Sequence, residues 1–531
     1  MKLIPYRSGQ RIIFGLKLAQ VIVFLRAALL CQAQTFDAFN PVVDGSYVYS
    51  AAMQTDGKII VAGVFTSLNA QARSFIGRLN SDGTLDLGFN PNINSGINTL
   101  ALLEDGKILV GGGFTSVGGQ ARKYLARLNG DGSLDTTFIP GNPSNPGVSD
   151  FVNALCLQAD GKILLGLSLP NTLGNPGRAL IRLNANGSVD ASFSPAGNGA
   201  VNALAIQADG KILEAGGEGL NLRPYLKKIN LDGTLDTAFR TGASPSWSYQ
   251  PAINCLTVRS DGTILVLGGI DFPPFLMGSL SRLDTDGNPD ITFTPPNSPV
   301  LYITAYTLGL QVNGRILAGY GGSGVIRSNP DGDQDGAFTN LPTACYLKRV
   351  YLQSDGKILQ AGQVCLRRIN NIEPATQSLA FDGSTITWLR GGSSPEVWRT
   401  SFDVSTNGVD WARVGAGERI TGGWQLPGLN YPTNSVIRAR GFVQEGGSSS
   451  WFVESFLGRS KVGIGRSGDF SLLSIEGDVG KSYTLEHAPS LAPGSSWQPL
   501  TSLQLTNGTE YYLDASSSNA AQRFYRVRLS Q

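Results

Sequence analysis

The sequence of 531 residues holds a single histidine, His487, near its C-terminal end. Ser-His-Asp and Cys-His catalytic groups both need a histidine as proton acceptor, and histidine is also a common metal ligand. Residues 34–371 contain no histidine, which excludes those catalytic groups and any histidine-based metal site there. Paired carboxylates for glycoside hydrolysis remain open as an alternative.

Cysteine is scarce too, with 5 residues in the whole chain. Cys31 lies in an N-terminal apolar segment, and the other four do not have the spacing of zinc ligands. Cys156 and Cys255 stand in apolar runs, so we expect buried thiols. Cys345 and Cys365 share the last repeat and are a candidate disulfide that would brace it; two free thiols are the other interpretation.

No apolar run after residue 33 is long enough to span a membrane comfortably. Within residues 1–33, basic side chains precede the apolar stretch 18–30, and small residues follow near Ala33. This pattern predicts a signal peptide with the mature chain starting at Gln34. A lipoprotein cysteine at Cys31 and a retained membrane anchor are the alternatives. We expect a protein secreted to the extracellular space or held at the cell envelope, without a membrane span once the signal is removed.

An excess of charge of one sign is also lacking. The whole chain holds 42 Lys and Arg against 40 Asp and Glu, and 37 against 40 without the first 33 residues. A strongly basic surface is the usual mark of proteins that bind nucleic acid or anionic membranes. The near-neutral chain therefore argues against nucleic acid as a partner.

What the chain does have is a repeat built around glycine turns. An Asp-Gly or Asn-Gly pair recurs seven times at intervals of 42 to 55 residues. A period near fifty is typical of propeller blades rather than of helical repeats. The seven turns are Asp56-Gly57, Asp105-Gly106, Asp160-Gly161, Asp209-Gly210, Asp261-Gly262, Asn313-Gly314 and Asp355-Gly356.

Each repeat divides into four short predicted strands. In the clearest copy these are residues 98–103, 107–114, 124–129 and 133–138. Asp-Gly between two apolar runs is a strong hairpin signal, because both residues tolerate the positive φ of a tight turn. Helical periodicity is absent, so the fold class is all-β.

The two ends of the repeat region complement one another. The last repeat stops after its third strand near residue 370, and the missing fourth strand appears at residues 35–41. There Phe39-Asn40-Pro41 resembles Phe89-Asn90-Pro91 of the next repeat. Pairing the two ends would remove two open sheet edges. We therefore predict a closed seven-bladed β-propeller over residues 34–371.

An antiparallel path places both glycine turns of every blade on one face of the disc and the longer, more variable loops on the other. Binding is expected on the long-loop face, because loops of variable length and content commonly carry function. Arginines at nearly the same repeat position precede the third strand and are candidate ligand-binding residues. Alternatively they bridge blades or are solvated. They are Arg73, Arg122, Arg178 and Arg223.

Oxygen-bearing side chains alternate in the turn between the third and fourth strands. Calcium prefers several such oxygens on a flexible loop. The alternative, which we favour, is that Asx side chains cap a tight turn. The clearest candidate calcium ligands are Asp284, Asp286, Asp290, Asp331, Asp333 and Asp335.

The composition changes after residue 371. Residues 34–371 hold one tryptophan, Trp247, whereas the rest of the chain holds six. Residues 372–462 and 463–531 each resemble a fibronectin type III or immunoglobulin-like module, in which a buried tryptophan and a late alternating strand pack the core. We therefore predict two small β-sandwich modules, the second a candidate sorting or anchoring element.

The repeat itself resembles a known family. Its paired signature, Gln-x-Asp-Gly-Lys-Ile-Leu and Arg-Leu-Asn-x-Asp-Gly-x-Leu-Asp-x-x-Phe, is similar to the delta-60 repeat of secreted bacterial β-propellers over about residues 35–370. The resemblance implies export and a propeller followed by fibronectin-like and sorting-type tails. It implies no particular reaction.

The expected function is that of a monomeric binding or scaffold protein, secreted or displayed on the cell surface. Its partner is expected to be an extracellular protein or polysaccharide, bound on the long-loop face. We expect no cofactor other than the possible calcium, and no enzymatic activity. The alternative is a carbohydrate-active enzyme, a glycosidase or lyase, on a propeller scaffold.

Overall fold

The described part of the protein is all-β. Among the described residues every regular element is a strand except one short 3-10 helix, η1 (Ala515–Ser517). None of the described helices is long and apolar enough to cross a membrane. The predicted signal peptide lies outside the described residues. The computed structural model describes residues 34–141, 148, 150–168, 179–195, 199–218, 223–240, 252–272, 275–294, 305–320, 324–338, 346–406, 410–445, 449–458, 461–467, 470–477, 482–489, 496–505, 509–517 and 523–529.

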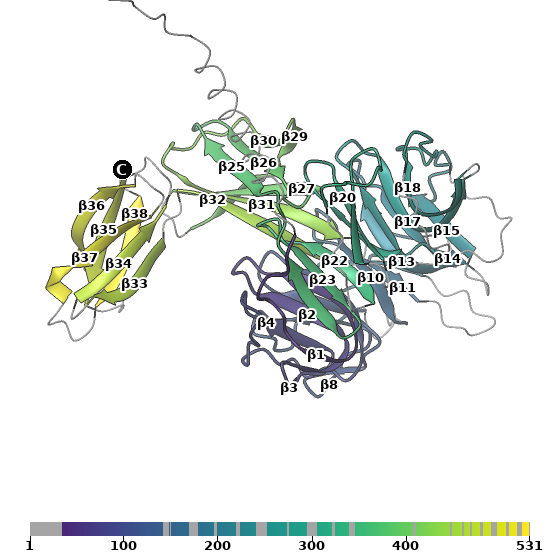
Figure 1. Ribbon diagram of the computed structural model, residues 1–531, viewed down its shortest axis with the longest axis horizontal. Helices are drawn as coiled ribbons and strands as arrows, with labels where there is room; N and C mark the ends of the chain where they lie inside the picture. The colour runs from purple at the N-terminus through teal and green to yellow at the C-terminus, as the bar shows by residue number, and fades with distance from the viewer. Residues whose placement is uncertain are drawn as a thin grey trace, which may run out of the picture.

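Seven antiparallel sheets follow one another along the chain and form the blades of a propeller (Figure 1). The first three are β1 (Val43–Met53), β2 (Ile59–Leu68), β3 (Gln71–Ala72) and β4 (Ile76–Leu79); β5 (Ile97–Leu102), β6 (Ile108–Gly112) and β9 (Leu125–Leu128); and β10 (Val152–Leu157), β11 (Ile163–Leu167) and β12 (Leu180–Leu183). A small hairpin of β7 (Ser116–Val117) and β8 (Gln120–Ala121) extends the loop of the second blade.

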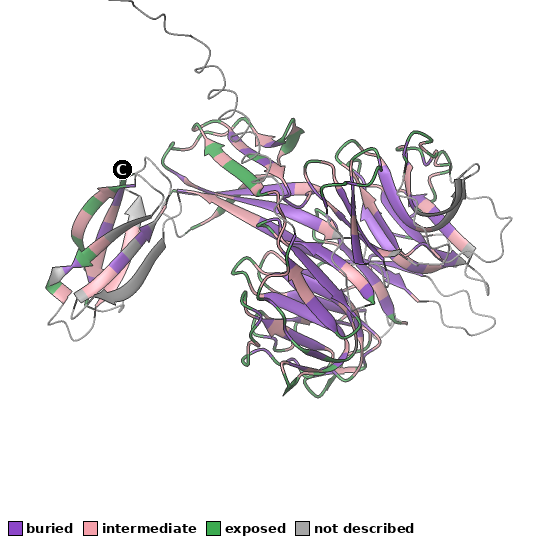
Figure 2. Cartoon of the chain, viewed as in Figure 1, coloured by how far each residue is buried: buried purple, intermediate pink, exposed green. Residues whose placement is uncertain are grey.

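The other four blades repeat the pattern. They are β13 (Ala200–Ile206), β14 (Ile212–Glu218) and β15 (Arg223–Ile229); β16 (Cys255–Val258), β17 (Ile264–Phe272) and β18 (Phe275–Leu283); β19 (Ala305–Leu310), β20 (Ile316–Tyr320) and β21 (Gly324–Ser328); and β22 (Leu347–Leu352), β23 (Ile358–Gly362) and β24 (Cys365–Ile369). The first and second strands of the blades are almost wholly buried (Figure 2). Both of their faces pack against neighbouring blades, which explains their near-continuous apolar sequence.

The fourth strand predicted for each blade is reduced to a single β-bridge between two residues. This part of the prediction is wrong. In the second blade only Leu128 and Leu134 pair, where residues 133–138 were expected to form a strand. The Asp135 amide donates to the Arg127 carbonyl at 2.9 Å, and Oδ1 of Asp135 accepts from the Thr137 amide at 3.0 Å. Asp135 therefore turns the chain away from the sheet directly after the Leu128–Leu134 bridge.

The N-terminal segment closes the ring, as predicted. Phe36 pairs with Ile369 of the last blade, and the Asp37 amide donates to the Arg368 carbonyl at 3.0 Å. Asp37 also pairs with the Arg368 guanidinium at 2.5 Å and with Lys357 at 3.4 Å. These are the contacts that Asp135 makes in the second blade, so the first and last segments of the propeller complete one blade.

The charged side chains that recur from blade to blade form a belt around the glycine-turn face. In the second blade, Asp135 accepts from both Lys107 (2.9 Å) and Arg127 (2.7 Å), and the Arg127 guanidinium lies over the Phe138 ring. Each third-strand cation also donates to the turn of the next blade. These interblade bonds are Arg78 to Gly130, Arg127 to Ala185, Arg182 to Leu231, Lys228 to Thr285, Arg282 to Pro330, Arg327 to Asn371 and Arg368 to Ser81.

The first part of the tail forms two further sheets. One consists of β25 (Ala375–Phe381), β26 (Ile386–Gly392), β30 (Gly423–Leu426) and β29 (Glu418–Ile420); the other consists of β28 (Ala412–Gly415), β27 (Arg399–Ser405), β31 (Val436–Glu445) and β32 (Ser449–Leu457). Trp388 is fully buried in the same cluster as Phe402 and Ile437. The predicted likeness to a fibronectin or immunoglobulin module remains a prediction.

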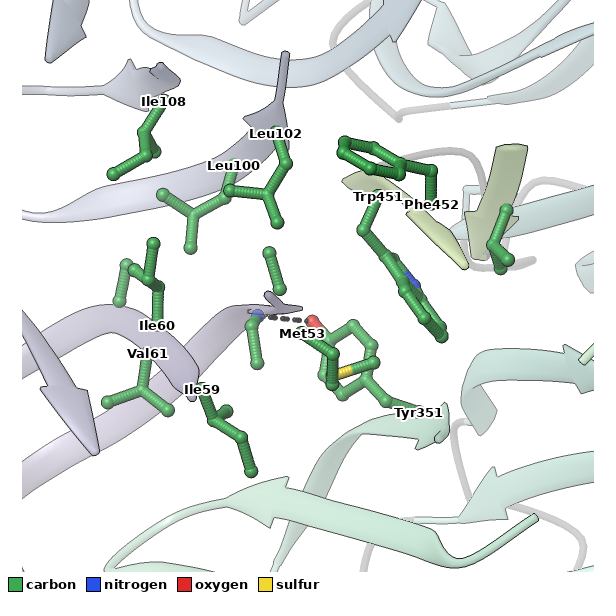
Figure 3. Packing of buried hydrophobic residues seen from close by; sticks show 14 of the residues in the cluster. Met53, Ile59, Ile60, Val61, Leu100, Leu102, Ile108, Tyr351, Trp451 and Phe452 are labelled. Atoms are coloured by element: carbon green, nitrogen blue, oxygen red, sulfur yellow. Dashed lines mark hydrogen bonds between the residues drawn. The ribbon is translucent and has the colours of Figure 1, made fainter. Parts of the chain in front are cut away.

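This tail unit packs directly against the propeller. The hairpin of β31 and β32 reaches the inner strands, where Ser450 pairs with Ala101 of β5 in a parallel bridge. Gln444 Nε2 donates to the Leu204 carbonyl of β13 at 2.6 Å. Trp451 and Phe452 lie beside Leu102 in one shared hydrophobic cluster (Figure 3).

The last part of the chain forms two three-stranded sheets around a small core of its own. They are β33 (Lys461–Ser467), β34 (Phe470–Glu476) and β37 (Thr509–Asp514), and β36 (Gln498–Gln504), β35 (Ser482–Ala488) and β38 (Phe524–Leu529). The shared core includes Leu473, Tyr483 and Leu505. The sorting or anchoring role predicted for this unit remains a prediction.

Candidate binding site

The innermost strand of the blades has an irregularity at one repeated position. In β5 the pairing with β6 skips Asn98, between Ile97 and Thr99. A β-bulge of this kind leaves one residue out of the ladder and re-aims its side chain. The same shift occurs in β1, β10, β13, β19 and β22, and it leaves out Tyr49, Asn153, Asn202, Tyr306 and Lys348.

These residues meet at the axis of the ring. Together with Asn254, just before β16, and Arg349 they line a cavity of about 240 Å³. The bulges lie at the starts of the inner strands, and the glycine turns follow the ends of those strands. The cavity therefore lies at the long-loop end of the axis, which is the face predicted to bind.

One wall of the cavity carries side-chain amides linked from blade to blade. Asn98 Nδ2 donates to the Val152 carbonyl at 3.1 Å and to Asn153 Oδ1 at 3.3 Å. Asn202 Nδ2 donates to the Ile253 carbonyl at 3.3 Å. These bonds hold the amides in place. Among the described residues, the other polar atom of each amide has no partner: Oδ1 of Asn98 and Asn202, and Nδ2 of Asn153. These atoms are available to a ligand.

The facing wall is aromatic and cationic. Lys348 Nζ lies 3.5 Å from the centroid of the Tyr306 ring and also within cation–π distance of Tyr346 (5.2 Å) and Tyr47 (5.4 Å). The hydroxyls of Tyr306 and Tyr346 lie 3.0 Å apart, and the Tyr47 and Tyr49 rings stack with centroids 5.6 Å apart. Burial lowers the pKa of the Lys348 ammonium below its usual range.

Arg349 supports this wall from behind. Its Nε donates to the Tyr49 carbonyl at 3.0 Å and its Nη1 to the Tyr306 carbonyl at 2.9 Å. The guanidinium thus ties the first, sixth and seventh blades together through backbone oxygens. No Asp or Glu is among the described residues that line the cavity.

The tail hairpin occupies the other end of the axis. Glu396, Trp398, Val443 and Gln444 of the tail pack there against the ends of the inner strands, and the space left between them is about 20 Å³. Gln444 Nε2 also contacts Cys156 Sγ at 3.1 Å. The tail hairpin therefore covers the glycine-turn end of the axis, opposite the end where the central cavity lies.

Of the arginines predicted as ligand-binding residues, the side chains of Arg73 and Arg122 are described, and neither lines this cavity. Arg73 donates to the carbonyls of Ala72 (2.8 Å) and Leu87 (3.1 Å), and Arg122 donates to the Ala121 carbonyl (2.8 Å). Both are half-buried in the loops before the third strand. Arg223 begins β15, but its side chain, like the whole of Arg178, lies outside the described part of the chain. The structure therefore brings neither Arg73 nor Arg122 into the central site.

The candidate calcium ligands are engaged in turns and ion pairs. Asp284 Oδ1 accepts from the amides of Asp286 (2.9 Å) and Asn288 (2.8 Å). Asp290 pairs with Arg282 and Asp335 with Arg327, each at 2.7 Å. The segment that follows Phe293 of the fifth blade contacts the third-to-fourth-strand turn of the sixth blade: the Asp333 carboxylate accepts from the Thr294 hydroxyl, and the Thr294 amide donates to the Asp331 carbonyl. No group of three or more acidic, Cys or His side chains suited to a metal occurs among the residues that the structure describes.

We expect chelation to leave the melting temperature of the full chain unchanged within about 1 °C, because the carboxylates of Asp284, Asp290, Asp331, Asp333 and Asp335 already have protein partners. Circular dichroism melts with and without a strong calcium chelator would measure this. A drop in melting temperature that added calcium reverses would instead support the calcium site.

The structure describes three of the four cysteines that follow residue 33. Cys156 and Cys255 are free and buried, and burial raises the pKa of the Cys156 thiol to about 12. Cys365 is disulfide-bonded, whereas its predicted partner Cys345 lies outside the described residues.

Residues 54–89, 103–138, 158–193 and 207–239 match the family described as a domain of unknown function (DUF5122) beta-propeller. Four blades of this chain match the model of this family's repeat. The match confirms the repeat-propeller resemblance drawn from the signature. None of the curated proteins matches the chain in sequence.

Several solved structures are similar to this chain. A streptogramin B lyase matches with 15% identity and a TM-score of 0.44, over 64% of this chain and 99% of its own. YCF48 bound to D1 peptide matches with 12% identity and a TM-score of 0.42, over 64% and 98%. PorZ, a surface component of the type-IX secretion system of Porphyromonas gingivalis, matches with 13% identity and a TM-score of 0.41, over 78% and 59%. Likenesses this distant carry no argument about the function of this chain.

Sequence reasoning missed the residues of the central cavity, although a signal was present. Asparagine follows the first apolar residue of the inner strand in four successive repeats, at Asn98, Asn153, Asn202 and Asn254. A polar residue kept at one position of an otherwise buried strand indicates a shared site in a ring of repeats. Alignment of the inner strands would have shown it.

Proposed function

We propose that this chain is an extracellular binding protein whose ligand enters the central cavity from the long-loop face. The observation that carries the proposal is that every blade contributes one polar or aromatic side chain at the same position of its inner strand. Buried amides and cations are costly unless they are hydrogen-bonded. A ring of them around an open cavity is best explained by a polar ligand that completes those bonds.

The location of the protein outside the cell rests on the leader pattern of residues 1–33. The near-neutral chain also favours a glycan or protein ligand over nucleic acid. Binding is favoured over hydrolysis because glycosidases act through two carboxyl groups, and the cavity lining supplies amides, tyrosines and cations. The extracellular ligand is thus a polar molecule, or the polar end of a larger one.

A cavity-filling substitution tests the proposal. The full chain would be screened on glycan and peptide arrays, and each hit titrated with the wild type and with Asn202→Trp. We expect the bulky indole to weaken binding at least about tenfold, because displaced ligand groups lose their hydrogen bonds.

Leu231→Trp is the matched control, since Leu231 is exposed in a turn on the opposite face. It should bind as the wild type does. Hits that keep full affinity for Asn202→Trp, or that lose it with Leu231→Trp, would show that the central cavity is not the binding site.

A further inference from the structure

The central cavity holds an uncompensated positive charge. Lys348 and Arg349 are half-buried in its wall, and no acidic side chain is among the lining residues that the structure describes. Within the described part of the chain, Lys348 has no carboxylate partner; tyrosine rings surround its ammonium instead. Arg349 is bonded to backbone carbonyls, so its charge is also not neutralised by an acid.

Such a cation favours a ligand that brings a negative charge. An unpaired charge taken out of water is costly, and cation–π contacts offset only part of that cost. An anion bound beside Lys348 would gain a charge-assisted hydrogen bond in a partly desolvated site, where such bonds are about twice as strong as neutral ones. The Lys348 wall should therefore favour an anionic ligand over a neutral polar one.

The remaining lining indicates the kind of molecule that carries the charge. Side-chain amides can each donate and accept, which suits the hydroxyls of a sugar ring. Asn254 makes no side-chain hydrogen bond among the described residues, so both its polar atoms are available. Tyrosine faces such as those of Tyr49 and Tyr306 pack against the C–H faces of sugars. A peptide with apolar side chains would need apolar subsites, and none of the described lining residues has an aliphatic side chain.

We propose that the cavity binds a carboxylate-bearing sugar residue of an acidic polysaccharide. Lys348 pairs with the carboxylate, the amides of the inner-strand bulges bond to ring hydroxyls, and the tyrosines contact the ring face. This inference rests on the proposed function and specifies the ligand class for the same site.

The test compares acidic saccharides with their neutral counterparts. Tetramers of galacturonic, glucuronic and mannuronic acid, and the same oligomers with their carboxyl groups reduced to alcohols, would be titrated calorimetrically into the full chain. We expect at least one uronate to bind, and its reduced form to bind about tenfold to a hundredfold more weakly, as the loss of a charge-assisted bond implies.

Substitutions then test whether Lys348 supplies the positive charge that binds the carboxylate. Lys348→Met should weaken uronate binding by the same factor while leaving binding of the reduced oligomer unchanged, and Asn254→Ala should weaken both. Lys227→Met is the matched control, because Lys227 is also half-buried and lies 4.3 Å from the centroid of the Tyr225 ring, outside the cavity. It should bind as the wild type does.

The outcomes separate this inference from the proposed function. Equal binding of acidic and reduced oligomers, lost with Asn202→Trp, would overturn the carboxylate assignment and leave the cavity as a binding site. Peptide hits without any saccharide hit, again lost with Asn202→Trp, would overturn the glycan class. Uronate binding that is unchanged in both Lys348→Met and Asn202→Trp would overturn both proposals.

Discussion

Replacing Trp451 with alanine should destabilise the propeller together with the tail, by about 3–5 kcal/mol, as large-to-small changes at buried aromatic residues do. Trp451 is only 2% exposed, and its cluster contains residues of both units. Met53, Leu102 and Tyr351 of the first, second and seventh blades lie around it (Figure 3). The cavity left by the indole would thus lie between the propeller and the hairpin that covers the end of its axis.

Urea unfolding of the full chain, followed by tryptophan fluorescence and by circular dichroism, would measure the loss. Limited proteolysis near residue 372 would show whether the tail separates from the propeller. Trp411→Ala is the control, since Trp411 is half-buried and packs edge-on against Phe456 on the tail itself. We expect it to cost less than about 1.5 kcal/mol. Equal small shifts for both variants would mean that the hairpin does not anchor the tail to the propeller.

Acid should destabilise the propeller, because folding lowers the pKa of one belt aspartate in six of its blades. Burial alone would raise the pKa of Asp135, but hydrogen bonds from Thr137, Lys107 and Arg127 outweigh it and hold the pKa well below its usual range. The equivalent carboxyls also have lowered pKa values. They are Asp37, Asp86, Asp190, Asp236 and Asp290.

A carboxyl whose pKa is lowered by folding contributes stability that is fully present above its unfolded pKa, near 4, and is lost as the pH falls toward the folded value. Because six blades carry such a group, we expect the free energy of unfolding to fall by several kcal/mol in total between about pH 5 and pH 2. Urea midpoints measured across that range would show it.

Asp135→Asn gives the matched test of this acid sensitivity. It should lower stability at pH 7, by breaking two ion pairs, and should make the fall in stability with acid less steep. Asp105→Asn, in the exposed turn of the same blade, should stay within about 0.5 kcal/mol of the wild type at pH 7. A wild-type stability that is flat from pH 7 to pH 2 would contradict the account of the charged belt.

The repeat signature predicted the blades because each of its residues has a local task. The glycine turns adopt φ values such as 83° at Gly106 and 92° at Gly132, which only glycine tolerates well. The Asp and Arg of the signature form the belt, and the Phe lies beneath the guanidinium. The length of the fourth strand was not predictable in this way, because the same aspartate that belongs to the signature also ends the pairing.

The candidate site was less predictable than the fold. Arg73 and Arg122 recur before the third strand and remain candidate ligand-binding residues of the long-loop face, but they do not line the central cavity. The inward position belongs to the bulge of the inner strand, where Asn98 and its equivalents stand. Periodicity shows that a residue recurs; it does not show how far from the axis that residue lies.

The sequence by itself determined the all-β class, the number of blades and the closure of the ring by residues 35–41, because turn chemistry and strand periodicity are local properties that repeat. Only the tertiary structure decided which side chains converge and what covers the axis. Tyr49 and Lys348 lie about 300 positions apart along the chain and meet because the ring is closed. The tail hairpin occupies the other end of the axis because Trp451 and Gln444 complement a surface that several distant blades build together.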